Sequence, residues 1–423
     1  MGKLQLSSAA IAAVLSLGLV SACIAEEAKG KIKAVSNLAK TIAVEVESKG
    51  VLVFKFDAGT QFKNAASAQD LIADEVVTVD FFQAGPEQRA RTVTKMIAPL
   101  PAGVTRIAAA ELEALLKKGG GNFVLIDSRP AGKYHEGHLP GAVSIPLNAL
   151  EKDGEKLLPA DKATTLVFYC GGLSCVLSPK SAAIAVKLGF KDVRIYPEGE
   201  PAWKKLDHPT ESSLSFVKDA NIVLVDLRSA EKAGLGHIPR AVNIPAARFN
   251  AAEKQFPEFK GAPVVLYSDS EHDLHQALEL MREWDYKNTT LFPGGITAWQ
   301  AAGNPLATGA APTKISYVRK LAEGEVSIKE FDDIVKTNSH LVIDARTTDE
   351  FKKGHFPGAM NIPAEEMAQR YAEIPAGKQA VVHCSTGTRA ELAYDILKEK
   401  GIRSRYLRAS VEFGPGNKVV VQE

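Results

Sequence analysis

The chain has 423 residues, of which 45% are hydrophobic and 24% are charged, a balance that is typical of globular domains. This length predicts two to four domains. The formal net charge is +1 and no basic run stands out, so the sequence argues against a nucleic-acid-binding protein.

Residues 1–25 have the features of an export signal. One lysine near the start precedes an apolar segment, residues 9–20, that is too short to span a bilayer. The segment ends in VSAC, which resembles a bacterial lipobox, so we expect residues 1–22 to be a signal peptide and Cys23 to be the lipidated mature N-terminus. The alternative is cleavage after Ala25, which would give a soluble periplasmic protein. Both alternatives place the protein in the bacterial cell envelope, and in the first its lipid anchor holds it at the periplasmic face of a membrane.

Residues 26–100 predict a small all-β module. They contain short runs that alternate in hydrophobicity or are rich in β-branched residues, parted by Gly50, Gly59 and Gly85. These runs are KTIAVEV, VLVFKF, EVVTVDFF and RARTVTKM. We expect an OB-like barrel, named here the β-module, and the sequence does not indicate its role.

The remaining sequence contains one pattern three times. Each copy has Asp-x-Arg, a His nine residues after the Arg, a Pro two residues further on and a second Pro after six more. The copies are residues 124–146, 223–245 and 341–363. A second apolar run, a loop, a helical pattern and a third apolar run follow each copy. This order predicts βα units around a parallel sheet.

The repeats therefore predict three α/β domains, each with three layers and a parallel central sheet. Their expected boundaries, which define the first, second and third repeats, are residues 104–208, 209–306 and 326–423. Residues 307–325 are rich in Gly, Pro and small residues, so we expect a linker between the second and third repeats.

The Asp, Arg and His of the pattern also occur in the second repeat, which lacks a cysteine. This favours a structural role, in which the buried Arg pairs with a carboxylate and the Asp fixes a turn at the end of a strand. Glu350 lies four residues after Arg346 and is a candidate partner for it. The matching residues in the other repeats are Lys133 and Lys232, so such a pair would be absent or made differently there.

The loop after the second apolar run differs between the repeats, and in the third it is HCSTGTRAE. Cys384 is placed where a parallel strand ends and a helix begins, so backbone N–H groups and the positive end of the helix surround the sulfur. Arg389 adds a full positive charge, and such surroundings favour the thiolate form of a cysteine. The loop residues expected to bind an oxyanion beside the sulfur are Ser385, Thr386, Gly387 and Thr388.

These motifs resemble those of rhodanese (thiosulfate sulfurtransferase) domains. The resemblance covers residues 104–420 and includes the Asp-x-Arg and Gly-His-hydrophobic-Pro-Gly-Ala motifs, with CSTGTR as the Cys-x-x-Gly-x-Arg loop. It implies that Cys384 takes sulfur as a persulfide from a small donor such as thiosulfate and passes it to a thiophilic acceptor, while residues 385–389 hold the sulfur group. Related cell-cycle phosphatases have five residues between Cys and Arg, whereas this loop has four and by analogy suits sulfur rather than phosphate. No cofactor and no metal site are expected.

Two other functions remain open alongside sulfurtransferase activity. The protein could carry sulfur, selenium or tellurium species on its thiols, or dock to a redox protein at the membrane, with little turnover. It could also be a structural envelope protein with vestigial loops, although the intact CSTGTR loop argues against this.

The corresponding loops of the first two repeats depart from this pattern. Ser268 replaces the cysteine in the second repeat, and a hydroxyl cannot carry a persulfide, so we expect a domain kept for packing or binding rather than a serine nucleophile paired with His272 or His275. In the first repeat Cys170 is in the cysteine position, but the loop is two residues longer, lacks the Arg and contains Cys175.

Three possibilities remain for this pair of cysteines. Cys170 could carry a persulfide that Cys175 resolves. The two could form a disulfide, which an exported location permits. They could also bind a metal or a chalcogen as soft ligands, although no further Cys or His pair completes such a site.

Overall fold

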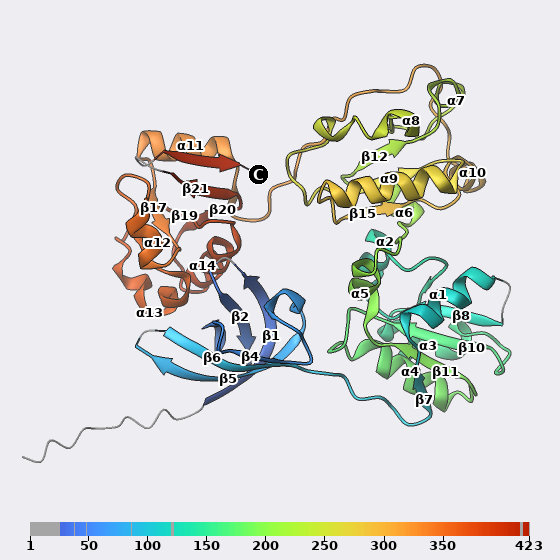
Figure 1. The fold of residues 1–423 in the computed structure, drawn as a ribbon, viewed down its shortest axis with the longest axis horizontal. Helices are drawn as coiled ribbons and strands as arrows, with labels where there is room; N and C mark the ends of the chain where they lie inside the picture. The colour runs from blue at the N-terminus through green and yellow to red at the C-terminus, as the bar shows by residue number, and fades with distance from the viewer. Residues whose placement is uncertain are drawn as a thin grey trace, which may run out of the picture.

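The computed structural model of the chain describes residues 26–37, 39–47, 49–85, 87–119, 122–414 and 418–422. The expected signal peptide and Cys23 lie outside these residues. Within the described part, no helix is both long and apolar enough to cross a membrane. The β-module comes first along the chain and the three α/β repeats follow it (Figure 1).

The β-module is a small barrel. Its elements are β1 (Glu26–Ser36), β2 (Thr41–Val46), β3 (Gly50–Lys55), β4 (Gln61–Lys63), the 3-10 turn η1 (Ala68–Asp70), β5 (Val76–Ala84) and β6 (Glu87–Lys95). The strands form one sheet in the order β3-β2-β1-β5-β6-β4, and an additional pairing of β3 with β6 closes it. Inward side chains such as Ile32, Val44 and Phe54 are fully buried. The expected small barrel is thus confirmed, and β1 is a strand that the sequence analysis did not predict.

The first and second repeats have parallel sheets. The first repeat contains β7 (Val104–Arg106), α1 (Ala109–Lys118), β8 (Phe123–Asp127), α2 (Ala131–Glu136), β9 (Val143–Ser144), α3 (Leu147–Leu157), β10 (Thr165–Tyr169), α4 (Leu177–Lys187), β11 (Val193–Tyr196) and α5 (Gly199–Lys205). The second contains α6 (Leu214–Asp219), β12 (Val223–Asp226), α7 (Ala230–Leu235), β13 (Val242–Asn243), α8 (Ala246–Phe249), η2 (Glu253–Gln255), β14 (Val264–Tyr267), α9 (Glu271–Glu283), β15 (Thr289–Leu291) and α10 (Gly295–Ala301). Their strand orders are β7-β11-β10-β8-β9 and β13-β12-β14-β15.

The third repeat has the same architecture with a hairpin added at its end. It contains β16 (Glu325–Val326), α11 (Ile328–Thr337), β17 (Leu341–Asp344), α12 (Thr348–Lys353), β18 (Met360–Asn361), η3 (Ala364–Glu366), α13 (Met367–Arg370), η4 (Tyr371–Glu373), β19 (Ala380–His383), α14 (Thr388–Glu399), β20 (Ser404–Leu407), β21 (Ser410–Phe413) and β22 (Val419–Gln422). The parallel sheet has the order β16-β20-β19-β17-β18, and β21 pairs with β22. The strand β19 is therefore central, and Cys384 follows it.

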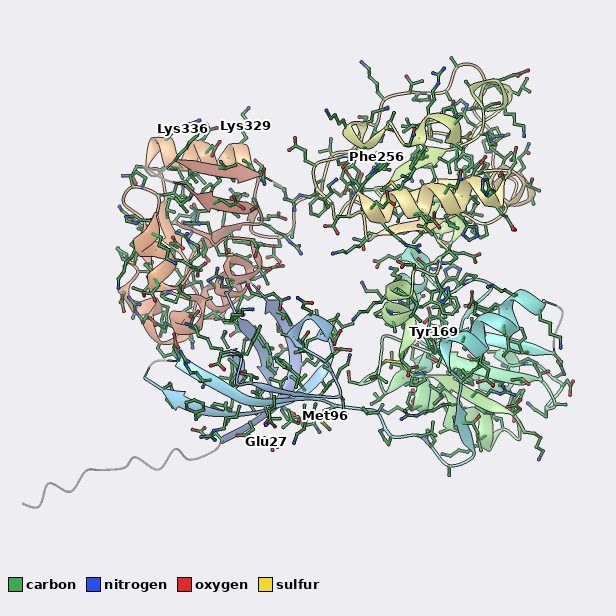
Figure 2. The ribbon with its side chains drawn as sticks, in the orientation of Figure 1. Glu27, Met96, Tyr169, Phe256, Lys329 and Lys336 are labelled. Atoms are coloured by element: carbon green, nitrogen blue, oxygen red, sulfur yellow. A yellow bond between two sulfur atoms is a disulfide. The ribbon has the colours of Figure 1, made fainter. Side chains whose placement is uncertain are left out.

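Each repeat has a buried apolar cluster on either face of its sheet, because successive strand residues point to opposite faces. In the third repeat, Ile343 and Val382 belong to one cluster, and Val342 and Val381 belong to the other. Side chains fill the space between the sheet and the helices on both sides (Figure 2). This arrangement confirms the expected three layers.

The β-module packs against the third repeat, although the two are far apart in the sequence (Figure 1). Ala43 of β2 belongs to the same buried cluster as Ala393 and Leu397 of α14, and Val51 and Val53 of β3 are partly buried against that cluster. The barrel and the helix that follows Cys384 thus share one apolar core.

Candidate active site

Cys384 lies at the carboxyl end of the central strand of the third repeat, and its side chain is completely buried, with 0% exposure. The N–H of Gly387 donates a hydrogen bond to Sγ over 3.1 Å. The helix α14 begins at the next residue. A backbone donor and the positive end of a helix therefore meet at the sulfur, and both stabilise negative charge on it.

Gly387 is required by the shape of this loop. Its φ is 87°, in the left-handed region, and a Cβ at this position would lie 2.7 Å from Cα of Arg408. Of the other loop residues, Ser385 is buried, Thr386 is exposed and Thr388 is half-buried at the start of α14.

Arg389 is the buried cation of the site, with only 4% of its surface exposed. Its Nη2 donates to Ser385 Oγ over 2.7 Å. Its two terminal nitrogens also donate to the two carboxylate oxygens of Glu350, over 2.7 and 2.9 Å. Burial by itself would lower the pKa of Arg389, but the Glu350 carboxylate and the negative charge of Cys384 raise it. Arg389 is therefore a permanent cation beside the thiol.

Glu350 is fixed in place by the start of α12. Thr347 and Glu350 form a reciprocal capping box, in which each side chain binds the backbone N–H of the other residue. Burial by itself would raise the pKa of Glu350, but the hydrogen bonds and charge of Arg389, together with the bonds to Thr347, lower it to about 2. The carboxylate is therefore ionised throughout the neutral range.

The expectation that Glu350 pairs with Arg346 is wrong. Arg346 binds Asp344, two residues earlier, through Nε and Nη2, and Nη2 also donates to the carbonyl of Gly354. The same contacts recur at Arg129 and Arg228 in the other repeats. This confirms the structural role of the Asp-x-Arg pair and leaves Glu350 available for Arg389.

The His of each pattern is also structural. Nδ1 of His138, His237 and His355 lies 2.8 to 3.0 Å from the carbonyl oxygen of the residue four positions earlier. None of these three imidazoles lies in the Cys384 loop, and the structure gives them the same local role in each repeat.

His383 is a buried imidazole that the sequence analysis missed. Its Nε2 lies 3.5 Å from Oδ2 of Asp344. In the other repeats this position is Tyr169 or Tyr267, whose hydroxyl donates to the matching aspartate. Burial lowers the pKa of His383 to about 4, so its imidazole is neutral at neutral pH. The aligned sequences contain a signal for it: just before the cysteine position, the first and second repeats each have a tyrosine, whereas the third has a histidine.

Comparison with known proteins supports the relationship that these loops suggest. The profile of the rhodanese-like domain matches residues 108–206, 212–302 and 327–412, which together make up more than half of the chain. The chain belongs to the rhodanese-like domain family. The three repeats are thus three rhodanese-like domains in tandem.

Individual relatives match only parts of the chain. It is 30% identical over 80 residues to the putative sulfur carrier protein YrkF of Bacillus subtilis, a match that covers 19% of this chain and 43% of that protein. It is 31% identical over 68 residues to a sulfurtransferase of Allochromatium vinosum, covering 16% of this chain and 64% of that protein. The structure of a thiosulfate sulfurtransferase from Pseudomonas aeruginosa is 18% identical with a TM-score of 0.26, covering 72% of this chain and 64% of that one. The chain therefore covers less than two thirds of each of these proteins.

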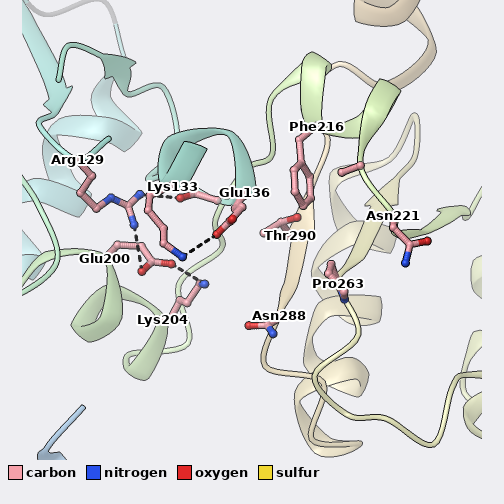
Figure 3. Close-up of a pocket in the computed structure, with 12 residues that line it drawn as sticks. Arg129, Lys133, Glu136, Glu200, Lys204, Phe216, Asn221, Pro263, Asn288 and Thr290 are labelled. Carbon is pink, nitrogen blue, oxygen red and sulfur yellow. Dashed lines mark hydrogen bonds and ion pairs between the residues drawn. The ribbon is translucent and has the colours of Figure 1, made fainter. Parts of the chain in front are cut away.

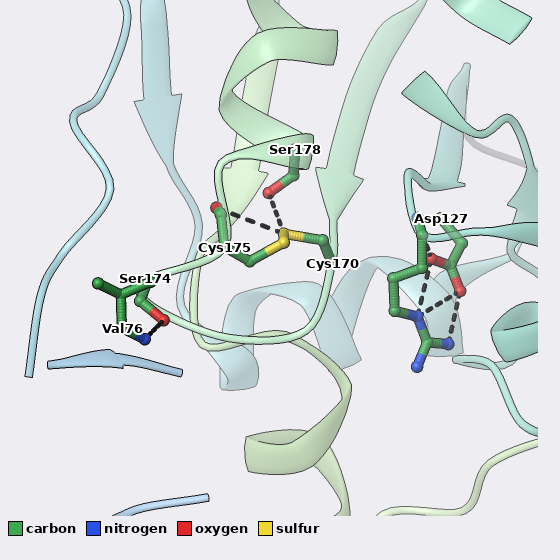
Figure 4. The surroundings of a disulfide bond; sticks show 7 residues. Val76, Asp127, Cys170, Ser174, Cys175 and Ser178 are labelled. Atoms are coloured by element: carbon green, nitrogen blue, oxygen red, sulfur yellow. Dashed lines mark hydrogen bonds and ion pairs between the residues drawn. A yellow bond between two sulfur atoms is a disulfide. The ribbon is translucent and has the colours of Figure 1, made fainter. Parts of the chain in front are cut away.

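The two cysteines of the first rhodanese-like domain form a disulfide (Figure 4). The Cα atoms of Cys170 and Cys175 are 6.4 Å apart. The Ser178 hydroxyl lies 3.1 Å from Sγ of Cys170, and a sulfur in a disulfide can only accept from it. Of the three possibilities that the sequence left open, the structure adopts the disulfide, and neither sulfur can carry a persulfide while that bond lasts.

The loop enclosed by this disulfide contacts the β-module. The N–H of Val76 in β5 donates to Oγ of Ser174 over 3.0 Å, and the N–H of Ala98 donates to the carbonyl of Leu173 over 2.7 Å. The longer cysteine loop of the first domain therefore forms part of the contact between this domain and the β-module.

The second rhodanese-like domain has Ser268 in the position of the cysteine. Ser268 accepts a hydrogen bond from the N–H of Ser270, and that bond shapes the turn before α9. His272 and His275 are exposed on α9. In the described part of the chain, no hydrogen bond joins the Ser268 hydroxyl to either imidazole.

A cavity of about 460 Å³ lies between the first and second domains (Figure 3). Its charged groups pair with one another: Glu200 with Lys204 at 2.5 Å and with Arg129 at 3.4 Å, and Lys133 with Glu136 at 3.1 Å. No cysteine lines it. The backbone N–H of Glu200, which lines the cavity, donates to the carbonyl of Cys170 over 3.2 Å, so the cavity borders the cysteine loop of the first domain.

Proposed function

We propose that the third rhodanese-like domain is a sulfurtransferase site in which the Cys384 thiolate carries sulfur as a persulfide. The observation that carries this proposal is the hydrogen bond from Gly387 N–H to Cys384 Sγ, with the permanent cation Arg389 in the same loop. The loops of the other two domains lack this combination, because one holds a disulfide and the other a serine.

The reaction is a double displacement. The Cys384 thiolate attacks the outer sulfur of thiosulfate, the S–S bond of the donor breaks, and sulfite leaves with the bonding electrons. An acceptor thiolate or cyanide then attacks the outer sulfur of the persulfide, and the Cys384 thiolate is the leaving group. Gly387 N–H and Arg389 stabilise the negative charge on Cys384 Sγ before the first step and after the second, and between the steps the charge lies on the outer sulfur of the persulfide.

Steady-state transfer of sulfur from thiosulfate to cyanide tests this assignment. Cys384→Ser should abolish transfer, because a hydroxyl neither attacks sulfur efficiently nor leaves as a thiolate does. Cys170→Ser with Cys175→Ser is the matched control and should retain transfer. Transfer by the Cys384→Ser variant at the wild-type rate would refute the proposal.

A second candidate function is a carrier that takes up sulfur, selenium or tellurium species and hands them on to a thiol or redox protein with little turnover. The complete burial of Cys384 supports it, because a buried thiol is reached slowly by small molecules. Single-turnover labelling separates the two functions: a carrier loads Cys384 once from thiosulfate but shows no sustained transfer to cyanide.

We also propose that the protein is exported as a lipoprotein through Cys23. The VSAC segment supports this, and the Cys170–Cys175 disulfide suits an oxidising compartment. Labelling with a radioactive fatty acid tests the anchor. The label should appear on the wild-type protein in the membrane fraction and be lost in Cys23→Ala, and an unlabelled wild-type protein would contradict lipidation.

A further inference from the structure

The disulfide of the first domain lies where the third domain has its thiol. Cys170 follows β10, the central strand of its sheet, as Cys384 follows β19, and the helix α4 begins at Leu177. The side chain of Cys170 is only 1% exposed. A sulfur between the end of a central strand and the start of a helix is in surroundings that favour a thiolate. A thiolate released from the disulfide at Cys170 is therefore stabilised where it forms.

Ser178, in the first turn of α4, has a hydroxyl that suits a thiolate better than a disulfide. The residue is 1% exposed, and its Oγ lies 3.1 Å from Sγ of Cys170 (Figure 4). In the part of the chain that the structure describes, this sulfur is the only hydrogen-bond partner of the hydroxyl. A disulfide sulfur is a weak acceptor, whereas hydrogen bonds to an ionised group are about twice as strong as neutral ones. Reduction therefore strengthens the one hydrogen bond that this buried hydroxyl makes.

Cys175 is the end of the disulfide that reaches the surface. It is half-buried, and the next residue, Val176, is 46% exposed. Cys175 and Ser178 line a small pocket of about 10 Å³, which has room for one water-sized group. The exposed Arg106 lines the same pocket and provides a positive charge that attracts a thiolate. The two cysteines thus differ, because Cys175 is open to solvent and Cys170 is enclosed.

The folded domain has partners for the cysteines in both redox states. In the reduced state a Cys170 thiol has the carbonyl oxygen of Cys175 as an acceptor, 3.5 Å from Sγ, and a Cys170 thiolate has the Ser178 hydroxyl as a donor. The cysteines are only five positions apart, and a disulfide constrains the unfolded chain least when its loop is short. This pair is therefore better suited to reversible exchange than to holding the domain together.

We propose that the Cys170–Cys175 disulfide is redox-active and exchanges with external dithiols. The first thiolate of the dithiol attacks Sγ of Cys175, the S–S bond of the protein breaks, and Cys170 leaves as a thiolate that accepts a hydrogen bond from Ser178. The first domain thus has a thiol–disulfide exchange activity of its own, which does not depend on sulfur transfer at Cys384.

A second displacement completes the exchange. The other thiolate of the dithiol attacks the dithiol sulfur of the mixed disulfide, and Cys175 leaves as a thiolate with the bonding electrons. The dithiol is oxidised by two electrons to a disulfide, and the protein disulfide is reduced by the same two electrons. The two protons of the dithiol pass through solvent to the two cysteines.

The rate of reduction by dithiothreitol, a small dithiol, tests the proposal on the full chain. Alkylation in denaturant at set times, followed by peptide mapping, measures the reduced fraction of Cys170 and Cys175. The rate should rise in proportion to the dithiothreitol concentration while the protein stays folded, because the dithiol reaches Cys175 directly. A rate that levels off at the rate of unfolding would overturn the inference, because the disulfide would then be reached only in the unfolded chain.

Ser178→Ala tests the stabilisation of the leaving group. Reduction should become about tenfold slower, as expected for the loss of a hydrogen bond to a charged group. Ser181→Ala, one turn further along α4, is the matched control. Its hydroxyl is also buried and has no hydrogen-bond partner among the described residues, so its removal should not change the rate. Equal slowing by the two variants would contradict the role given to Ser178.

The ionisation of Cys170 separates this role from a structural one. In the Cys175→Ser background, the ultraviolet absorbance of the thiolate gives the pKa of Cys170, and the Cys170→Ser, Cys175→Ser double variant is the blank. Adding Ser178→Ala should raise the pKa of Cys170 by about one, which corresponds to the tenfold change in rate. An unchanged pKa would show that Ser178 does not stabilise the thiolate.

The two single-cysteine variants show which sulfur is attacked. Cys170→Ser leaves Cys175 as a free thiol, and Cys175→Ser leaves Cys170 free. With hydroxyethyl disulfide as the probe, Cys175 should form a mixed disulfide faster than Cys170, because this mixed disulfide is the intermediate of the exchange reached from the opposite direction. Faster reaction at Cys170 would overturn the proposed direction of attack.

Discussion

Arg389 and Glu350 show at the residue scale what the sequence could and could not reveal. The Cys-x-x-Gly-x-Arg spacing places Arg389 beside Cys384, because the residues lie within one tight loop. The partner of Arg389 was not predicted, because Glu350 is 39 positions away in the sequence. One signal was available: the first two repeats lack both the loop Arg and this Glu, with Lys133 and Lys232 in its place.

Glu350→Gln should weaken the third domain and slow sulfur transfer. The substitution leaves the buried Arg389 without its counter-charge, and a buried polar group that loses its partner costs about 1–3 kcal/mol. The free energy of unfolding and the transfer rate are the measurements. Glu373→Gln removes an exposed ion pair with Arg370 and serves as the control, with little change expected in either quantity. Equal effects of the two variants would contradict the role given to Glu350.

His383 should make the third domain sensitive to acid. Its pKa is about 4 in the folded protein against an ordinary value of 6.5, so below 6.5 the unfolded chain takes up a proton that the folded one does not. The contribution of neutral His383 to the free energy of unfolding is therefore fully present above pH 6.5. It decreases by about 2–3 kcal/mol as the pH falls towards 4. The stability that ionised Glu350 contributes is lost at lower pH, because its pKa in the folded protein is about 2.

His383→Tyr should remove this dependence, because the tyrosine of the other two domains donates to the matching aspartate and does not titrate in this range. The free energy of unfolding measured from pH 7 to pH 4 checks it. An unchanged slope in the His383→Tyr variant would show that other groups cause the acid sensitivity.

At the scale of elements, the pattern of apolar residues along the sequence predicted the βα units well. Strands that are buried on both faces give short apolar runs, and these are easy to recognise. The helical pattern expected after the Cys170 loop is α4, which begins at Leu177. The strand β1 was missed, because it is rich in charged residues and few of its side chains face the barrel interior. Its place is set by pairing with β2 and β5, which a local pattern cannot reveal.

Reduction of the Cys170–Cys175 disulfide should loosen the contact between its loop and the β-module. The loop holds Ser174 and Leu173 towards the barrel, and opening the bond increases the number of conformations that the loop samples. Hydrogen exchange at the N–H groups of Val76 and Ala98 should become faster. The N–H of Phe56, which is bonded to Lys40 within the barrel, is the internal control. Unchanged exchange at Val76 and Ala98 would show that the disulfide is not needed for this contact.

At the scale of the whole molecule, the barrel and the third domain form one core although two other domains separate them in the sequence. The tandem repeats could be predicted from their spacing. The packing of the barrel on the third domain could not, because the sequence around Ala43 and Val53 does not indicate which distant residues they contact. The shared core explains how the β-module can contribute to the surroundings of Cys384.

Phe54→Ala tests this coupling. Phe54 is fully buried in the barrel, and truncation of such a side chain costs about 3–5 kcal/mol. Hydrogen exchange should become faster in the barrel and also in α14, whereas α9 of the second domain should not change. Faster exchange in the barrel alone would show that the third domain is stable without it.

The proposed function requires Cys384 to be the thiol that carries sulfur. Intact mass of the full chain after exposure to thiosulfate, followed by peptide mapping, tests it most directly. One sulfur atom should be added to the peptide that contains Cys384, while Cys170 and Cys175 remain joined in their disulfide. Sulfur found on Cys170 or Cys175, with Cys384 unmodified, would contradict it.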